Sequence, residues 1–192
     1  MIAAFRTSIL FLLIITLITG IIYPVTVAVI GQGLFKWKAD GSLIMRDGKV
    51  MGSELIGRRF KGLGYFYSRP SYAGEGYDAT ASGASNYAIS NNELVFAINQ
   101  DIERIRLHSA NRKSQIPADL VTSSASGLDP DISIAGAYYQ IPRIARERKI
   151  SGETVKELID RNAEKRLFGI FGENHVNVLL LNLQLDDMTK KK

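Results

Sequence analysis

The stretch TSILFLLIITLITGIIYPVTVAVIGQGLF, residues 7–35, decides how this chain is organised. It contains no charged residue. Its apolar core from Ser8 to Ile30 is long enough for one helix to cross the hydrocarbon part of a bilayer, which takes about 20 apolar residues. Lipid cannot satisfy free backbone groups, so a spanning segment must be helical. We therefore predict a membrane anchor over residues 1–35, with its transmembrane helix at about residues 8–30.

The residues around the apolar segment bear on whether it is cleaved and on its orientation in the membrane. A cleaved signal peptide would have a shorter apolar region, about 7–15 residues, followed by a small-residue cleavage site. Residues 8–30 are longer and no convincing site follows, so we favour a retained anchor. Arg6 favours an inside position for the amino terminus, whereas Lys36 and Lys38 oppose it. Charge alone therefore gives only a small preference for an extracytoplasmic domain.

The remainder of the chain, residues 36–192, is polar enough to form a soluble domain. It holds all 19 acidic residues and every basic residue except Arg6. Its length allows one hydrophobic core. This division argues against a multi-span transporter, a wholly cytosolic protein and a disordered chain. The chain has no cysteine, so disulfides, a thiolate nucleophile and cysteine-ligated metals are excluded.

The first part of this domain is expected to be extended and irregular. Asp47-Gly48 between two short apolar runs predicts a β-hairpin over residues 42–51, because both residues tolerate the positive φ of a type I′ turn. A further extended piece is expected near residues 54–60. Residues 61–92 are rich in glycine, serine, asparagine and tyrosine without periodicity, which predicts an ordered, irregular surface loop.

The second part alternates between helices and strands. We expect a core-facing amphipathic helix capped by Ser90 and running to about Ala110, and a short strand after Pro117 that leads into a turn of small residues. We also expect a helix near Ser133 with a kink or restart at Pro142, and a helix from Ser151 to about Glu164. Residues 176–185 are apolar on both faces and predict an internal strand. Together the pattern indicates an α+β fold, one N-terminal transmembrane helix followed by a small mixed α/β soluble domain over residues 36–192.

The residues that usually carry catalysis are sparse. His108 and His175 have no second ligand at metal-site spacing, so we expect no metal site. Ser123, Ser124 and Ser126 form a serine-rich turn that does not match the G-x-S-x-G nucleophile motif. Neither the P-loop nor the dinucleotide glycine pattern occurs. We therefore expect no catalytic residues, and an anchored hydrolase using the serine turn is a minor alternative.

The basic cluster of Arg143, Arg146, Arg148 and Lys149 has acidic residues nearby and no interleaved aromatic residues. This composition is typical of a solvated helix face rather than of a nucleic-acid site. No nucleic-acid partner is expected.

Several segments, in order along almost the whole chain, resemble one family. They are Tyr23-Pro24, Gly41-Ser-Leu, Gly52-Ser-x-Leu-Ile-Gly57, Tyr65-Phe-x-x-Arg-Pro-Ser71, Ser82-Gly-x-Ser-Asn86, Asp119-Leu-Val-Thr-x-Ser-Ala-Ser-Gly-Leu-Asp129, Tyr139-Gln-Ile-Pro-Arg-Ile-Ala145, Gly172 and Val176-Asn-Val-x-x-Leu-Asn-Leu-x-Leu185. This pattern is similar to the KdpC family, the small C subunits of the Kdp potassium-transporting P-type ATPases. The chain departs from it at Ala84 and at residues 173–175, which affects local loop shape.

The resemblance implies a non-catalytic subunit of a high-affinity potassium uptake pump, needed for assembly and stability of the complex. The implied partners are a channel-like potassium-translocating subunit, an ATP-hydrolysing P-type subunit and the lipid bilayer. The implied location is the cell (inner) membrane, with a single span and an extracytoplasmic domain. The family is also described as raising the ATP affinity of the pump, and a glutamine matching Gln140 is proposed to contact nucleotide. ATP is thus a possible ligand, without a tightly bound cofactor, although ATP is scarce outside the membrane.

We expect the long loop to meet the partner subunits through Tyr67, Arg69, Pro70, Ser82 and Asn86. The main alternative is a filament protein of the pilin type, which also joins an N-terminal apolar helix to an α/β head. Such proteins usually carry a glutamate early in the helix, and residues 7–35 have no acid.

Overall fold

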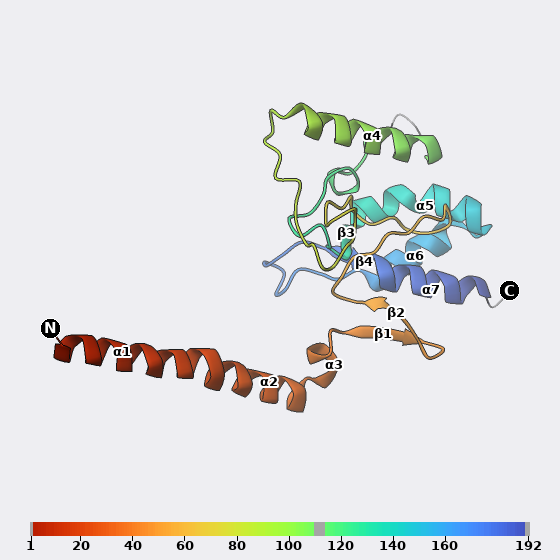
Figure 1. Cartoon of the computed structure of the whole chain (residues 1–192). Coiled ribbons are helices and arrows are strands. Elements are labelled where there is room, and N and C mark those ends of the chain that lie inside the picture. Colours follow the sequence, from red (N-terminus) through yellow and green to blue (C-terminus); the bar gives the residue numbers. More distant parts are fainter. Residues whose placement is uncertain (1, 110–113, 191–192) are drawn as a thin grey trace. The chain divides into compact units, whose positions relative to one another are not determined.

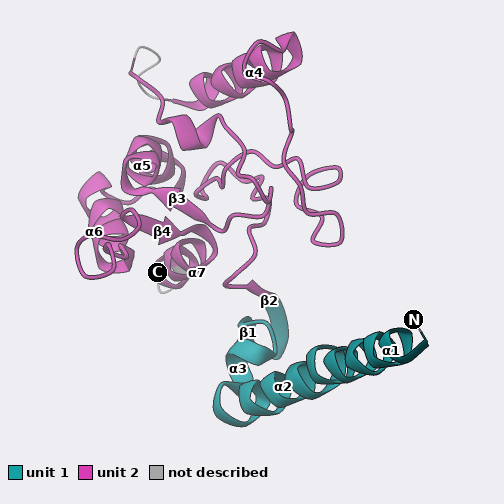
Figure 2. Ribbon diagram, turned by 90° about the vertical axis from the view of Figure 1, so that its left-hand side faces the viewer, with its two compact units in different colours: residues 1–51 teal, residues 52–192 magenta. Residues whose placement is uncertain are grey.

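The computed structural model describes residues 2–109 and 114–190, and the chain forms two compact units, Met1–Met51 and Gly52–Lys192 (Figures 1 and 2). The helices and strands of the described residues are α1 (Ile2–Leu17), the π-helical turn Ile18–Ile22, α2 (Tyr23–Leu34), α3 (Lys36–Ala39), β1 (Leu43–Arg46), β2 (Lys49–Ser53), α4 (Asn92–His108), the 3₁₀ turn Ala118–Leu120, β3 (Asp131–Ser133), α5 (Ile134–Arg148), α6 (Gly152–Asn162), β4 (His175–Asn177) and α7 (Val178–Lys190).

A single apolar helix dominates the first unit. It runs over Ile2–Leu34, and its 33 residues are long and apolar enough to cross a membrane. None of its apolar window is buried by the rest of the chain, so its surface requires lipid or other helices. The hydroxyls of Thr7, Thr19 and Thr26 each donate to the carbonyl four residues earlier, which satisfies these polar groups inside the helix. The predicted N-terminal apolar helix is confirmed.

The helix is locally widened just before Pro24. Residues Ile18–Ile22 form a π-helical turn immediately ahead of this proline. Proline has no N–H to donate, and its ring crowds the carbonyl four residues earlier, which is that of Gly20. A π turn accommodates such a mismatch without ending the helix.

The predicted hairpin is confirmed. Strands β1 and β2 pair, and Asp47 and Gly48 between them have φ values of 50° and 71°, as a type I′ turn requires. The extended piece expected near residues 54–60 is wrong, because these residues form a turn and irregular backbone. The Gly57 N–H donates to the carbonyl of Leu128 at 2.7 Å, so it bonds the irregular segment before β3 rather than a strand.

The second unit packs α5, α6 and α7 around a two-stranded antiparallel sheet, β3 and β4 (Figure 1). Ile132 faces Val176 in this sheet, and both side chains are buried. The core consists of apolar side chains from the helices, the sheet and the loop: Phe66, Leu120, Ile132, Ala137, Ile144, Val155, Leu158, Ile159, Val176, Val178, Leu181 and Leu185. The α+β class is confirmed.

Two helices begin where the sequence predicts, at Ser133 and Ser151. The Ser133 hydroxyl accepts from the N–H of Gly136 at the start of α5, and the Ser151 hydroxyl accepts from the N–H of Thr154 at the start of α6. The restart expected at Pro142 does not occur, because α5 runs through this residue. Buried side chains just before and after Pro142 are tied to the loop and hold the helix together.

The internal strand expected over residues 176–185 is wrong. Only His175–Asn177 form a strand, and α7 begins at Val178. The Asn177 carboxamide oxygen accepts from the N–H groups of Leu179 and Leu180, both at 3.1 Å, and so caps the helix. An apolar run of this length suits a buried strand or a buried helix, and periodicity does not separate them.

Two further predictions fail around the long loop, residues 54–91, which contains no helix or strand. Helix α4 is capped by Asn91 rather than Ser90. None of its residues is fully buried, but its partly buried Ile105 packs against the core, as expected for a core-facing helix. Its apolar face is half-covered at best, and Val95, Phe96 and Leu107 are exposed. Ala110, the expected end of this helix, lies outside the described residues. After Pro117 there is a 3₁₀ turn instead of a strand.

Candidate functional site

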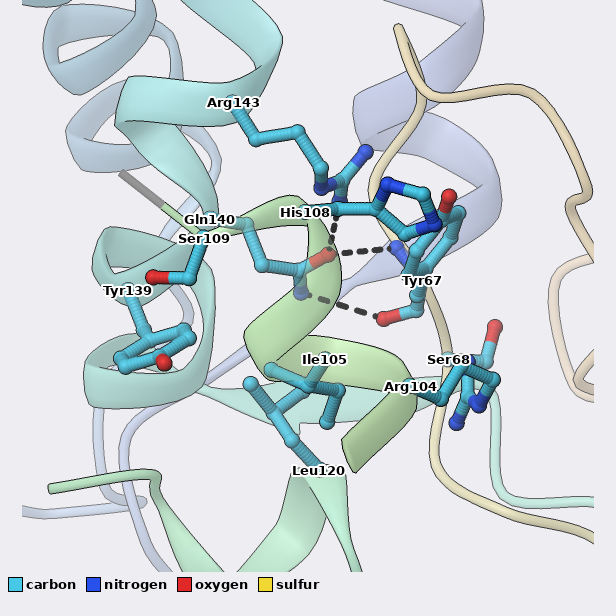
Figure 3. A pocket seen from close by; sticks show the side chains of 10 residues that line it. All are labelled: Tyr67, Ser68, Arg104, Ile105, His108, Ser109, Leu120, Tyr139, Gln140 and Arg143. Carbon is cyan, nitrogen blue, oxygen red and sulfur yellow. Dashed lines mark hydrogen bonds between the residues drawn. The ribbon is translucent and has the colours of Figure 1, made fainter. Parts of the chain in front are cut away.

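Two buried side-chain amides hold the long loop against the helices. On α5, the Gln140 oxygen accepts from the N–H of Tyr67 at 2.7 Å, and its nitrogen donates to the Tyr67 carbonyl at 3.2 Å (Figure 3). On α7, Asn182 does the same for Phe66, at 2.8 and 3.0 Å. Two consecutive loop residues are therefore paired as if by neighbouring strands. An unpartnered buried backbone group is costly, so these amides fix the loop in place.

Gln140 has no hydrogen-bonding position left for another molecule in this conformation. Its oxygen also accepts from Arg143 Nη2 at 2.7 Å, and its nitrogen also donates to the Gly136 carbonyl at 3.3 Å. A carboxamide offers two donors and two acceptor positions, and this chain uses all of them. Contact between Gln140 and a nucleotide would require at least one of these bonds to break.

Arg143 is the buried cation of the site. It is only 5% exposed and donates to the carbonyls of Leu63 and Tyr65, the latter at 2.9 Å. Its guanidinium lies 3.9 Å from the centroid of the Tyr67 ring. Burial lowers the pKa of Arg143 to about 10, so it remains charged at neutral pH. No carboxylate of the described residues forms an ion pair with it, and its partners are carbonyl oxygens and an aromatic face.

The expectation of a solvated basic cluster on α5 is therefore wrong for Arg143, and it is also wrong for Arg148. Arg148 Nη2 pairs with Asp186 Oδ1 at 2.8 Å, and its Nε donates to the Gly64 carbonyl at 2.8 Å. Arg146 is exposed, as expected. The helix turns Arg143 and Arg148 toward the loop, so the loop carbonyls replace solvent around them.

A groove of about 590 Å³ opens between the long loop and α4. The α4 side of the groove is formed by Ala97 and four polar side chains of that helix: Gln100, Asp101, Arg104 and His108. The loop side includes four aromatic side chains: Phe60, Tyr67, Tyr72 and Tyr77. Arg59, Lys61, Arg69 and Arg104 outnumber Asp101, so the lining is basic. Of the residues expected to contact partners, Tyr67, Arg69 and Pro70 line this groove.

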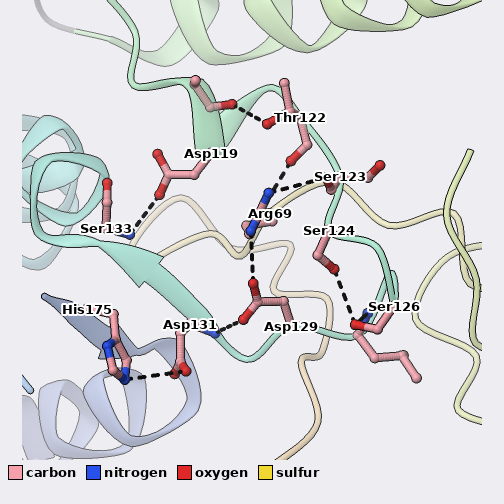
Figure 4. A network of polar contacts seen from close by, with 12 residues as sticks. Arg69, Asp119, Thr122, Ser123, Ser124, Ser126, Asp129, Asp131, Ser133 and His175 are labelled. Atoms are coloured by element: carbon pink, nitrogen blue, oxygen red, sulfur yellow. Dashed lines mark hydrogen bonds and ion pairs between the residues drawn. The ribbon is translucent and has the colours of Figure 1, made fainter. Parts of the chain in front are cut away.

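Tyr77 and Arg69 line the groove and are fixed by hydrogen bonds and an ion pair. The Tyr77 hydroxyl donates to the Arg69 carbonyl, and burial raises the pKa of that hydroxyl, which keeps it a donor at neutral pH. The Arg69 side chain pairs with Asp129 at 2.9 Å and donates to the Ser123 carbonyl at 3.2 Å (Figure 4). Arg69 thus joins the loop to the serine-rich turn rather than pointing freely into the groove.

Ser82 and Asn86 do not line the groove. The Ser82 hydroxyl donates to the Ser126 carbonyl at 2.9 Å, which adds a second tie between the loop and the serine turn. Asn86 has φ of 53°, a backbone conformation that asparagine tolerates better than most residues. The residues expected to contact partners therefore lie at two separate places on the loop.

The serine turn itself is held by local bonds. The Ser124 and Ser126 hydroxyl oxygens lie 3.3 Å apart, and the Ser126 hydroxyl accepts from the N–H of Leu128. Among the described residues, no hydrogen bond joins these serines to a histidine. His175, drawn in the same view, contacts Asp131 instead (Figure 4).

His175 forms an ionic cluster at the start of β4. Its Nε2 lies 3.7 Å from Asp131 Oδ2 and 3.6 Å from Glu164 Oε2, and its Nδ1 bonds the Glu173 carbonyl at 2.8 Å. The hydrogen bond to the Glu173 carbonyl, followed by the nearby carboxylates, raises the pKa of His175, whereas burial raises the pKa of Asp131. In the part of the chain that the structure describes, no group of three or more histidine or acidic side chains could hold a metal ion.

Sequence reasoning missed Arg143, Asn182 and Asp129 as site residues. All three fall inside the motifs that carry the family resemblance, so their motif membership was the available signal. Their roles depend on contacts with Tyr65, Phe66 and Arg69, which lie 60 or more positions away in the chain.

Comparison with known proteins identifies what this chain is similar to. A family model described as "KdpC: K+-transporting ATPase, c chain" matches residues 5–187. A protein of Methylococcus capsulatus is 49% identical over 187 residues, covering 97% of this chain and 98% of the relative. A protein of Acidobacterium capsulatum is 48% identical over 183 residues, covering 95% of this chain and 97% of the relative. Both carry the name "Potassium-transporting ATPase KdpC subunit".

Proposed function

Because the chain belongs to the KdpC family of potassium-transporting ATPase subunits, we propose that it acts as the non-catalytic subunit on which assembly and stability of an ATP-driven potassium uptake pump depend. The family match runs through the apolar helix as well as the second unit. It therefore leaves the filament-protein alternative and the anchored-hydrolase alternative without support.

The unburied apolar helix is the observation that carries this proposal. Its apolar window is 0% buried within the chain, so the helix needs a bilayer or the transmembrane helices of a partner. In this proposal the helix packs in the membrane against the channel-like potassium-translocating subunit and the ATP-hydrolysing P-type subunit. The second unit stands on the extracytoplasmic side, where the long loop and its basic groove meet the partners.

The way in which the long loop is held supports the proposal that this loop contacts the partner subunits. The loop has no ladder of backbone hydrogen bonds of its own, and four buried or half-buried polar side chains on the helices hold it instead. These are Gln140, Arg143, Arg148 and Asn182. A rigid irregular loop presents a defined surface, which lowers the entropy lost when a partner binds.

The test is recovery of the complex from membranes in mild detergent. Full-length tagged chain should co-purify with a P-type ATPase and a multi-span potassium subunit. A chain that lacks residues 1–35 should fail to do so. Normal assembly and transport with the shortened chain would refute the anchoring role, and recovery of the full chain alone under conditions that express the partners would refute the subunit role.

The family resemblance also implies a second function: the chain would raise the ATP affinity of the pump, with Gln140 contacting the nucleotide. The matched pair Gln140→Ala and Asn182→Ala tests it, because both substitutions remove a buried amide that holds the same loop segment. A fluorescent ATP analogue is titrated into purified full-length chain. Loss of binding in Gln140→Ala alone supports direct contact. Equal loss in both variants assigns the effect to the loop, and absence of binding to the unmodified chain refutes contact.

A further inference from the structure

The hairpin over residues 164–175, between α6 and β4, exposes four large apolar side chains at its tip. Leu167, Phe168, Ile170 and Phe171 are 63%, 84%, 73% and 65% exposed, and none belongs to the core. They lie within five consecutive residues, so they form one contiguous patch. Such a patch marks a site of interaction with a protein or a membrane.

The backbone of the hairpin presents these side chains as a defined projection. Leu167 and Phe171 exchange two backbone hydrogen bonds, at 2.9 and 3.0 Å. Phe168 and Gly169 between them have φ of 54° and 73°. Left-handed backbone is unfavourable for a bulky residue such as phenylalanine. Phe168 is thus strained and exposed at once, so its side chain contributes nothing to the core of this chain.

The base of the hairpin is fixed to the sheet. Glu164 and His175 exchange two backbone hydrogen bonds, at 2.9 and 3.1 Å, and the His175 ring lies within 3.7 Å of the Asp131 carboxylate. In Figure 1 this segment is the blue loop that extends away from α6 and β4. The tip is therefore a narrow projection on a fixed base. Such a shape suits insertion into a lipid bilayer better than docking onto a flat protein surface.

The proposed membrane anchor of the same chain brings a bilayer close to the second unit. Residues 35–51 join the anchor helix to the second unit and include α3 and most of the β1–β2 hairpin. Even a fully extended segment of this length would span at most about 60 Å, and the folded segment spans less. A unit of this size has a radius of gyration of about 14 Å. The second unit is therefore tethered within the span of this segment from the bilayer that holds the anchor.

We propose that the tip of the 164–175 hairpin inserts into the interfacial region of that bilayer as a second membrane contact. Phe168 and Phe171 enter the boundary between headgroups and acyl chains, where aromatic and aliphatic side chains insert favourably. Lys165 and Arg166 precede the tip, are exposed, and keep their charged ends at the phosphate level. Glu164 and Glu173, on the two arms of the hairpin, offset these two positive charges, so apolar contact dominates over attraction to anionic lipid. This inference rests on the anchoring part of the proposed function and not on the identity of the partners.

The test places a tryptophan at the tip. Trp37 is the sole tryptophan, so the background is the full-length chain with Trp37→Phe. Phe168→Trp reports on the tip, and Phe96→Trp is the matched control, because Phe96 on α4 is also an exposed phenylalanine (60%). Each protein is reconstituted alone into phosphatidylcholine and phosphatidylglycerol vesicles, with or without bromine on the acyl chains near the headgroup.

Bromine quenches a tryptophan that lies at the depth of the interface. Emission of Phe168→Trp should fall about two-fold in brominated vesicles, since interfacial side chains insert about 5–10 Å, whereas that of Phe96→Trp should not change. Adding Phe171→Ser to Phe168→Trp should reduce the quenching. Equal behaviour of the two tryptophans overturns the proposal. The proposal is also overturned if the tryptophan of Phe168→Trp becomes shielded from water only after the other pump subunits are added. That result would assign the tip to a protein partner. Quenching is measured without partners, so it fails independently of the assembly test.

Discussion

Substituting Asn182 by leucine should release the long loop from α7. Asn182 is 1% exposed, and both of its hydrogen bonds go to the backbone of Phe66, which is 0% exposed. Leucine matches the apolar surroundings and the approximate volume, so the helix and its packing remain. The N–H and carbonyl of Phe66 are then buried without partners.

The expected loss of stability follows from these two groups. Each buried backbone group that loses its partner costs about 1–3 kcal/mol, so the pair costs about 2–6 kcal/mol. Leucine favours the helix over asparagine by about 0.5 kcal/mol, which offsets a small part. The net expectation for Asn182→Leu is a decrease of about 2–5 kcal/mol in the free energy of unfolding, a large share of the stability of a typical domain.

The matched control is Gln184→Leu on the same helix. Its carboxamide is exposed and bonds only to that of Asn162, so its substitution should change stability by no more than about 0.5 kcal/mol. Urea unfolding of the full chain in mild detergent, followed by circular dichroism, measures both variants, because the apolar helix stays folded in detergent and the transition reports on the second unit. If Asn182→Leu is as stable as Gln184→Leu, the side-chain amides do not hold the loop and the reasoning is wrong.

Three other substitutions test separate contacts. Gly57→Ala should destabilise the second unit by about 1–3 kcal/mol in the same urea assay, because its new Cβ would lie 2.5 Å from the Asp129 carbonyl oxygen; unchanged stability would show that this backbone crossing can relax. Arg69→Gln should cost about 1–3 kcal/mol and lower recovery of the pump complex, because it removes the ion pair that ties the loop to Asp129; Arg69→Gln in an Asp129→Asn background should cost less, and an equal cost would refute the pairing. His175→Gln should remove a pH dependence: the His175 pKa is raised in the folded chain, mainly by the Glu173 carbonyl, so its stabilisation is complete below about pH 6.5 and is lost as pH rises through the folded value. Stability of the unmodified chain relative to His175→Gln should therefore be greater at low pH, and a constant difference across this range would contradict the assignment.

Local patterns were sufficient where one short-range rule acts without competition. The long apolar helix follows from the absence of charge over residues 7–35, since such a surface suits lipid or other helices. Asp47-Gly48 predicts its hairpin because few other residues accept two consecutive positive φ values. Ser133 and Ser151 predict helix starts because their hydroxyls bond N–H groups only three residues away.

The candidate site could be predicted only in part. Tyr67, Arg69 and Pro70 do line one groove, and Gln140 does contact the loop. The charged neighbours of Arg143 in the chain predict a solvated side chain, whereas its actual neighbours in space are Leu63 and Tyr65. Local sequence carries no information about partners that lie so far away along the chain.

By itself, therefore, the sequence determined the N-terminal apolar helix, the hairpin, the helix starts at Ser133 and Ser151 and the family to which the chain belongs. Only the tertiary structure decided whether residues 178–185 form a strand or a helix, because an apolar run can be buried in either form. The cap at Asn177 and the contact of Asn182 with Phe66 favour the helix. It also decided that α4 buries none of its residues while Phe66 is fully buried. Burial depends on which surfaces meet, and hydrophobic free energy is proportional to the area that contact removes from water.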